Sequence, residues 1–175
     1  NQLLNPKTGV RAKYPHLKFV ISIGGWYDSN FFSFAVSDKY RTNFVQSVVK
    51  YVVAFGFDGV DFDWEYPAFE HGGEPAPGAP KKGDPEGITD CTTDTCQAPS
   101  RKDDAANYAK FLTEVRAAFT KEEQRTNRAD KYIMSIAGPA GKDKLEKLDL
   151  KTMCEALTYV NVMAYDMHGS FDATN

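Results

Sequence analysis

The stretch Asp58-Gly59-Val60-Asp61-Phe62-Asp63-Trp64-Glu65 places four carboxylates among apolar residues and one glycine. We expect residues 57–65 to form a β-strand, in which alternate side chains point to opposite faces. Asp61, Asp63 and Glu65 then share one face of the strand. Burying a carboxylate is costly unless it is paired or neutralised. Three carboxylates on one face therefore favour a catalytic role, which needs carboxyl groups with different pKa values, over a role in stability alone.

The residues between the carboxylates favour a strand over a solvated acidic segment. Val60, Phe62 and Trp64 would form a buried outer face, with Trp64 in the core beneath a helix. Carboxylate clusters also hold Mg²⁺ or Ca²⁺. The motifs elsewhere in the chain argue against that alternative, and we expect neither a metal nor a cofactor. Asp58 is expected to be structural, fixing the start of the strand through local backbone hydrogen bonds.

Size and composition limit the possible functions. The chain has 175 residues, enough for one domain with a core, and 42% hydrophobic and 26% charged residues are typical of a globular protein. A net charge of −3 argues against binding to nucleic acid or to an anionic membrane. No apolar run is long enough to span a bilayer. The chain opens at Asn1 without Met, so the lack of a signal peptide is uninformative.

Three cysteines suggest one local disulfide and one free thiol. Cys91 and Cys96 bracket a short polar loop, and this spacing is compatible with a disulfide. Cys154 lies among apolar residues and is expected to be a buried free thiol. No second Cys or His pair stands at the spacing that a metal site needs.

Strand-like and helix-like segments alternate along the chain. Further strands are expected at 19–23, 131–136 and 159–165. One helix is expected from a cap at Ser37-Asp38 to Gly56, one from Asp103-Asp104, and a short one around 150–157. The apolar stripe of the first helix comprises Tyr40, Phe44, Val48, Val52 and Phe55, and that of the second Tyr108, Phe111, Leu112, Val115 and Phe119.

Residues 66–102 break this pattern, because they are rich in Pro and Gly and have no periodicity. A loop of this length in a compact domain is usually functional or disordered. It begins directly after Glu65, so we expect it to be a surface excursion that walls the site that Glu65 faces.

Alternating strands and helices indicate parallel βαβ units, in either a closed barrel or a doubly wound sheet. In both architectures functional groups gather at the carboxyl ends of strands. Gly24-Gly25-Trp26, Glu65 and Tyr165-Asp166 all fall at such ends. No Gly-x-Gly-x-x-Gly follows any expected strand, which argues against a dinucleotide site.

Three motifs together resemble one known family. Asp58–Glu65 resembles the D-x-x-D-x-D-x-E signature of glycoside hydrolase family 18, the chitinases. Ser22-Ile23-Gly24-Gly25-Trp26 is similar to that family's S-x-G-G strand, and Met163-Ala164-Tyr165-Asp166 to its M-x-Y-D strand. They occur in the family's order and at compatible separations. The stretches 140–144 and 169–172 look closest to the bacterial chitinase A type.

The resemblance implies an eight-stranded (β/α) barrel, the TIM barrel, which typically needs about 250 residues. The strands expected here would be about strands 3 to 6 of it. We therefore expect residues 1–175 to be a partial catalytic barrel domain with an insertion at about 66–102, lacking the first two and last two strands. The resemblance also implies a secreted, extracellular protein that is monomeric when complete.

The family acts by substrate assistance, an exception among glycosidases. The resemblance implies that Glu65 is the general acid and that the substrate's own acetamido oxygen attacks the anomeric carbon, with net retention. Asp63 would accept a hydrogen bond from the acetamide N–H. Asp61, deeper in the barrel, would share a proton with Asp63. Tyr165 would hold the acetamide oxygen, although it could instead be a core tyrosine.

Sugar binding needs flat apolar surfaces for the faces of the rings. We expect Trp26 and Met163 to contact chitin or a chito-oligosaccharide, together with Asp166. Ser22 would donate to Asp61 or Asp63, or would simply pack beside Gly24. Other aromatic or polar residues near strand ends remain possibilities: Tyr27, Phe31, Phe32, Phe69, His168 and Phe171.

The predicted function is therefore a chitinase that cleaves β-1,4-linked N-acetylglucosamine. The alternatives are an endo-β-N-acetylglucosaminidase acting on N-glycans and a non-catalytic chitin-binding lectin. Such lectins typically lack the acid or its Asp neighbour, and this chain has both Glu65 and Asp63.

Overall fold

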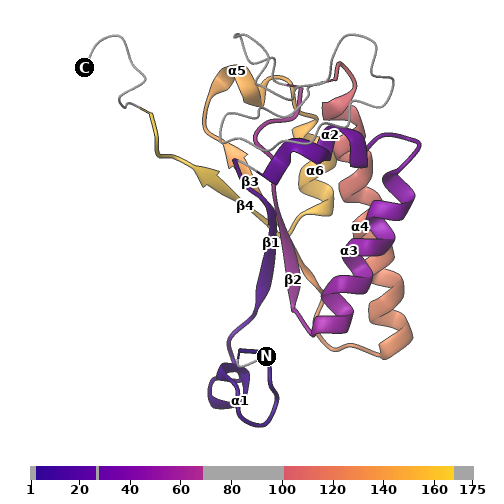
Figure 1. Ribbon diagram of the computed structural model, residues 1–175, viewed down its shortest axis with the longest axis vertical. Coiled ribbons are helices and arrows are strands. Elements are labelled where there is room, and N and C mark those ends of the chain that lie inside the picture. Colours follow the sequence, from indigo (N-terminus) through magenta and orange to yellow (C-terminus); the bar gives the residue numbers. More distant parts are fainter. Residues whose placement is uncertain (1–2, 27, 69–100, 168–175) are drawn as a thin grey trace.

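The computed structural model describes residues 3–26, 28–68 and 101–167. Its strands form one parallel sheet in the order β1-β2-β3-β4, namely β1 (Val20–Gly24), β2 (Gly59–Asp63), β3 (Ile133–Pro139) and β4 (Tyr159–Met163). The long connections carry α3 (Arg41–Phe55), α4 (Asp104–Thr126) and α6 (Leu150–Ala156), which lie together on one side of the sheet (Figure 1). The shorter helices are α1 (Val10–Lys13), η1 (Asp28–Phe31), α2 (Phe32–Ala35) and α5 (Lys142–Leu145).

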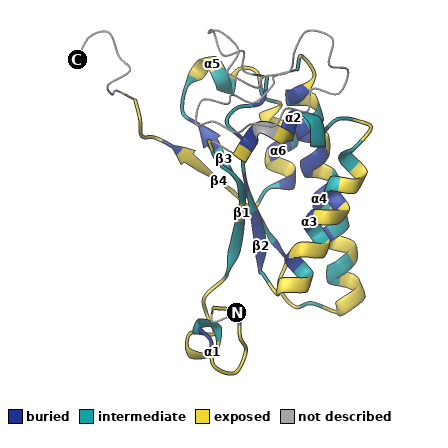
Figure 2. Ribbon diagram, viewed as in Figure 1, coloured by how far each residue is buried: buried dark blue, intermediate teal, exposed yellow. Residues whose placement is uncertain are grey.

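The alternation along β2 separates core from site as predicted. Val60 and Phe62 are fully buried and Trp64 is 2% exposed, whereas Asp61 and Asp63 are only half-buried on the opposite face. The buried residues lie between the sheet and the helices (Figure 2). Alternate side chains of a strand point to opposite faces, so one buried face leaves the other for polar groups.

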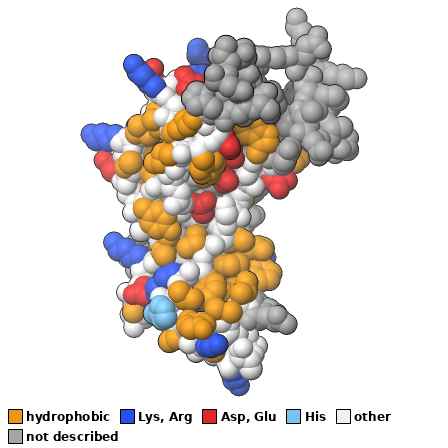
Figure 3. Space-filling model, turned by 90° about the vertical axis from the view of Figure 1, so that its left-hand side faces the viewer, with side chains coloured by type: hydrophobic (Ala, Val, Ile, Leu, Met, Phe, Trp, Pro, Cys, Tyr) orange, Lys and Arg blue, Asp and Glu red, His pale blue; other side chains and the backbone are white. Residues whose placement is uncertain are grey.

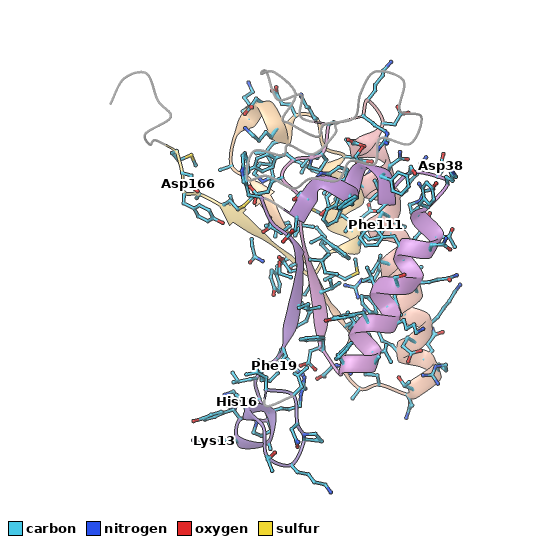
Figure 4. The ribbon with its side chains drawn as sticks, viewed as in Figure 1. Lys13, His16, Phe19, Asp38, Phe111 and Asp166 are labelled. Carbon is cyan, nitrogen blue, oxygen red and sulfur yellow. The ribbon has the colours of Figure 1, made fainter. Side chains whose placement is uncertain are left out.

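An aromatic cluster forms the core behind the carboxyl end of β2. Phe32 of α2 stacks on Trp64 with 5.4 Å between ring centroids, and Tyr108 of α4 meets Trp64 edge-on at 5.1 Å. Phe111 lies between the helices and the sheet, where it contacts Phe62 (Figure 4). Offset and edge-on pairs of this kind add to the free energy gained by burial.

The predicted apolar stripe of α4 is confirmed, since all five of its residues are buried. The predicted apolar stripe of α3 is only partly confirmed. Val48 and Val52 are buried, but Val45 is buried as well and Phe55 is 51% exposed. The predicted stop is confirmed, because Gly56 caps α3 with a left-handed φ of +74°.

The predicted start of α3 at Ser37-Asp38 is wrong, because the helix begins at Arg41 and its N-cap, Tyr40, makes no side-chain cap bond. Asp38 instead accepts a hydrogen bond of 2.8 Å from Arg41, which outcompetes capping. The predicted start of the next helix at Asp103-Asp104 is confirmed, because α4 begins at Asp104 with Asp103 as its N-cap, although Asp103 makes no side-chain cap bond.

Strand boundaries and one cysteine also differ from the prediction. β2 ends at Asp63 and β4 at Met163, so Glu65 and Tyr165 lie just past their strands, and β3 continues to Pro139. Cys154 is a free thiol, but it is exposed rather than buried, because Met153 and Ala156 take the inward positions of α6. Cys91 and Cys96 lie outside the described residues.

Asp58 anchors the amino-terminal end of β2, which confirms its structural role, but it does so through partners distant in the sequence rather than through the predicted local backbone hydrogen bonds. It accepts hydrogen bonds from the Arg11 guanidinium (2.8 Å), from Arg128 (3.1 Å) and from the backbone N–H of Phe19 (2.8 Å). Burial alone would raise the pKa of Asp58, but the bonds from Arg11 and Phe19 outweigh it and lower the pKa. Phe19 and the α1 region lie at the end of the sheet remote from the site (Figure 4).

Among the described residues, no helix has the length and apolar character to cross a membrane.

Candidate active site

Asp61 lies at the centre of a polar row that crosses the sheet. The strand register aligns Ser22 of β1 and Ser135 of β3 with Asp61. Ser22 Oγ donates to Asp61 Oδ2 at 3.0 Å, while Ser135 Oγ and Asn161 Nδ2 donate to Oδ1 at 2.6 and 3.1 Å. Three donors from three different strands hold this carboxylate in one orientation.

Asp63 and Glu65 form a hydrogen-bonded carboxyl pair at the end of β2. Burial, then the negative charge of Asp61, raises the pKa of Asp63. Burial, then the charge of Asp63, raises the pKa of Glu65. Their mutual hydrogen bond raises the pKa of Glu65 and lowers that of Asp63, which favours Glu65 as the donor and Asp63 as the acceptor of this bond.

The two carboxyl groups of this pair differ in their other hydrogen-bond partners. Asp63 Oδ1 is buried with no hydrogen-bond partner among the described residues, which leaves an acceptor available in the site. Tyr66 is hydrogen-bonded to Glu65, and burial together with the charge of Glu65 raises the pKa of the Tyr66 hydroxyl. The tyrosine therefore stays a neutral donor toward Glu65.

The backbone of β1 approaches the end of β2 very closely. Gly24 has a φ of +112°, and a Cβ there would lie 2.1 Å from the carbonyl oxygen of Asp63. Gly25 donates its N–H to the same oxygen at 2.7 Å. Only glycine tolerates both the conformation and the contact, so Gly24 brings the turn that carries Trp26 directly beside the carboxyl pair.

The remaining predicted site residues lie at or just past the carboxyl ends of β1 and β4. Trp26 is 49% exposed and Tyr165 63% exposed, whereas Met163 is buried at the end of β4. Asp166, with a φ of +51°, lies beyond β4 on the side away from the helices (Figure 4), and its charge gives a small further rise to the pKa of Glu65. Acidic side chains gather on the face turned from the helices, beside exposed apolar groups (Figure 3).

Three polar residues of the site were missed by the sequence reasoning. Ser135 and Asn161 lie on predicted strands, and a register for the sheet would have aligned Ser135 with Asp61. Tyr66 immediately follows the motif, but nothing in the local pattern indicates its turn back toward Glu65. Other predicted residues lie outside the described ones, namely Tyr27, Phe69, His168 and Phe171.

The described ranges contain no group of three or more His, Cys, Asp or Glu side chains that could hold a metal ion. The arrangement offers a carboxyl group, Glu65, whose pKa is raised by burial and by the charge of Asp63, beside a carboxylate that has an oxygen without a partner among the described residues. Such a pair can donate a proton to a leaving group while the carboxylate stabilises positive charge.

Residues 2–175 match the family model described as glycosyl hydrolases family 18. Chitinase 1 of Aphanocladium album is 32% identical over 157 residues, which are 89% of this chain and 30% of that protein. Chitinase A of Pseudoalteromonas piscicida is 32% identical over 93% of this chain and 17% of its own length. The solved chitinase ChiA74 of Bacillus thuringiensis superposes with a TM-score of 0.73 and 34% identity, over 97% of this chain and 24% of that one.

The chain thus spans less than a third of the length of these relatives. Its parallel sheet, with helices on one face, is part of a TIM barrel, which confirms the predicted fold class.

Proposed function

The chain belongs to glycosyl hydrolases family 18, and from this premise we propose that the full-length protein is a chitinase hydrolysing β-1,4-linked N-acetylglucosamine polymers. The observation that carries this proposal is the hydrogen-bonded carboxyl pair of Glu65 and Asp63, in which burial and then the charge of Asp63 raise the pKa of Glu65. A glycosidase needs an acid that is still protonated at working pH, and a raised pKa supplies one.

The proposed reaction is substrate-assisted and proceeds with retention. Glu65 protonates the glycosidic oxygen while the substrate's acetamido oxygen attacks the anomeric carbon, and water then opens the cyclic intermediate. Asp63 accepts from the acetamide N–H, a role supported by its Oδ1, which has no hydrogen-bond partner among the described residues. Asp61 provides a fixed charge behind Asp63, and Tyr165 donates to the acetamide oxygen so that it is held for attack.

The proposed sugar contacts lie around the same strand ends. The half-exposed ring of Trp26 offers a flat apolar face to a pyranose ring. Met163 forms the apolar floor, and Asp166 binds a sugar hydroxyl. Ser22 acts through Asp61, to which it donates.

The organisation and location of the protein are also proposals. Residues 1–175 are part of the catalytic barrel domain, with residues 66–102 as an insertion on the catalytic face. The substrate is chitin or a chito-oligosaccharide, and the full-length protein is secreted, monomeric and without a cofactor. A Cys91–Cys96 disulfide fits a secreted protein.

The test is Glu65→Gln in the full-length protein, with Glu155→Gln on the exposed surface of α6 as the matched control. The amide keeps the shape of the side chain but carries no transferable proton. We expect hydrolysis of chito-oligosaccharides to fall by about 10²–10⁴-fold or more, with binding retained and the control unchanged. Turnover close to that of the wild type would contradict the assignment of Glu65.

A second arm tests substrate assistance. Oligosaccharides deacetylated at the reacting unit lack the internal nucleophile, so we expect the wild type not to cleave there. Equal cleavage at acetylated and deacetylated units would overturn this mechanism. Binding of chitin without turnover would indicate a lectin, and release of N-glycans in preference to chitin cleavage would indicate an endo-β-N-acetylglucosaminidase.

A further inference from the structure

Ser29, in η1, has a fully buried side chain whose hydroxyl joins the two segments that carry the candidate site. Its Oγ lies 2.5 Å from the carbonyl oxygen of Gly25 and 3.0 Å from that of Asp63, and it accepts the backbone N–H of Glu65 at 3.2 Å. A hydroxyl has one proton and two lone pairs. It can therefore donate to one carbonyl at a time while accepting from Glu65.

This contact matters because Glu65 lies beyond the end of the strand ladder. The pairing of β1 with β2 ends at Gly24 and Asp63, so sheet hydrogen bonds do not reach the backbone of Glu65. The Ser29 hydroxyl supplies the hydrogen bond that its N–H would otherwise lack. A buried N–H without a partner is unfavourable. Loss of the hydrogen bond to Ser29 would therefore let the peptide group at Glu65 rotate.

We propose that Ser29 is a positioning residue for the proton donor: its hydroxyl fixes the backbone of Glu65 and couples it to the turn that carries Trp26. The inference rests on the proposed function, in which Glu65 delivers the proton. Proton transfer depends on the placement of the acid to within a fraction of an ångström, and a shift of about 1 Å can lower a rate about a hundredfold. Ser29 itself touches neither the substrate nor the reacting atoms.

Ser33 provides a matched control. It is equally buried and lies four residues further on, in α2, but its hydroxyl donates to Asp104 at 2.7 Å and accepts from Arg101 at 2.7 Å. Ser29→Ala and Ser33→Ala therefore both remove a buried hydroxyl from neighbouring positions. Only the first removes a partner of Glu65.

The experiment compares two substrates of the full-length protein. Cleavage of a chito-oligosaccharide requires protonation of a poor leaving group, whereas the para-nitrophenyl glycoside of the same sugar departs with little help from an acid. For Ser29→Ala we expect kcat on the oligosaccharide to fall between about tenfold and a hundredfold with KM nearly unchanged. The loss on the para-nitrophenyl glycoside should be much smaller. Ser33→Ala should keep kcat within about twofold on both substrates, even if it melts at a lower temperature.

Equal losses on the two substrates, or an unchanged kcat for Ser29→Ala, would overturn the inference. If Ser29→Ala fails to fold, Ser29→Cys fills nearly the same space with a weaker acceptor, and the same dependence on the leaving group is expected. Glu65→Gln, assayed in parallel, separates the two proposals. If it loses turnover while Ser29→Ala behaves as the wild type, only the role of Ser29 fails, whereas an active Glu65→Gln refutes the proposed function itself.

Discussion

Asp61 and Asp63 stand two residues apart on β2, yet their surroundings give them different properties. Asp61 accepts from three side chains and has little freedom to turn. Asp63 has one buried oxygen with no partner among the described residues and shares a hydrogen bond with Glu65. The first carboxylate is thus held by the protein alone, while the second has an acceptor left for a ligand.

The pH dependence of activity provides a test at the scale of single residues. A general acid works only while protonated, so activity should fall as the pH rises through the pKa of Glu65. Burial, the charge of Asp63 and, to a smaller degree, the charge of Asp166 raise this pKa and extend the active range upward. Asp166→Asn removes one negative charge, so the alkaline limb of the kcat/KM profile should move to lower pH.

Asp143→Asn on α5 is the control for that measurement, because Asp143 is 61% exposed and pairs with Lys144 rather than with the carboxyl pair. Its alkaline limb should coincide with that of the wild type. An Asp166→Asn limb that stays in place or moves to higher pH would contradict the electrostatic account of Glu65.

The site was predictable from the sequence where its residues belong to one strand. Alternation along Asp58–Glu65 separates Asp61, Asp63 and Glu65 from Val60, Phe62 and Trp64. Ser135 and Asn161 come from other strands, and only the sheet register brings them to Asp61. Tyr66 and Ser29 depend on turns after the strand ends, whose paths are set by tertiary contacts rather than by periodicity.

Among the secondary-structure elements, α4 was predicted better than α3. All five stripe residues of α4 are buried, and this helix is flanked by α3 and α6. Phe55 lies at the end of α3 and is exposed, although it fits the helical spacing. Spacing shows which residues share a face, but not how far the partner surface extends.

The anchor at the start of β2 yields a prediction about stability. The side chain of Asp58 is 7% exposed and pairs with Arg11 and Arg128, whose side chains are each 26% exposed. Asp58→Ala leaves two partly hydrated guanidinium groups and the N–H of Phe19 without their acceptor. We expect the free energy of unfolding to fall by about 2–3 kcal/mol, below the range for fully buried pairs because water reaches the arginines.

The pH dependence of this effect follows from the lowered pKa of Asp58. The stabilisation is present above the ordinary pKa of the carboxyl group and is lost as the pH falls through the lowered, folded-state value. The difference between wild type and Asp58→Ala in urea denaturation should therefore shrink in strong acid. Asp130→Ala, which removes an exposed partner of Lys18, should change stability far less than Asp58→Ala does. Equal changes in stability for Asp58→Ala and Asp130→Ala would contradict the role of Asp58 as the anchor of β2.

At the scale of the whole molecule, the described sheet has two edges, β1 and β4. The side chains of β4 are largely exposed, including Tyr159 at 45%, Val160 at 39% and Val162 at 58%. β4 also projects away from the helices in Figure 2, where most of it is exposed. In a closed barrel both edges would pair with further strands and these apolar side chains would be covered. The four strands therefore present surfaces that an eight-stranded barrel buries.

This incompleteness predicts the behaviour of residues 1–175 expressed alone. Unpaired strand edges and exposed apolar side chains promote association between copies. The carboxyl pair would also lack the opposite wall that a barrel provides to hold the substrate in line with Glu65. We expect the isolated segment to associate with increasing concentration and to show no turnover of chito-oligosaccharides under conditions where the full-length protein is active. Analytical ultracentrifugation and a parallel activity assay measure both properties. A monomeric segment with the turnover of the full-length protein would show that four strands suffice to build the site.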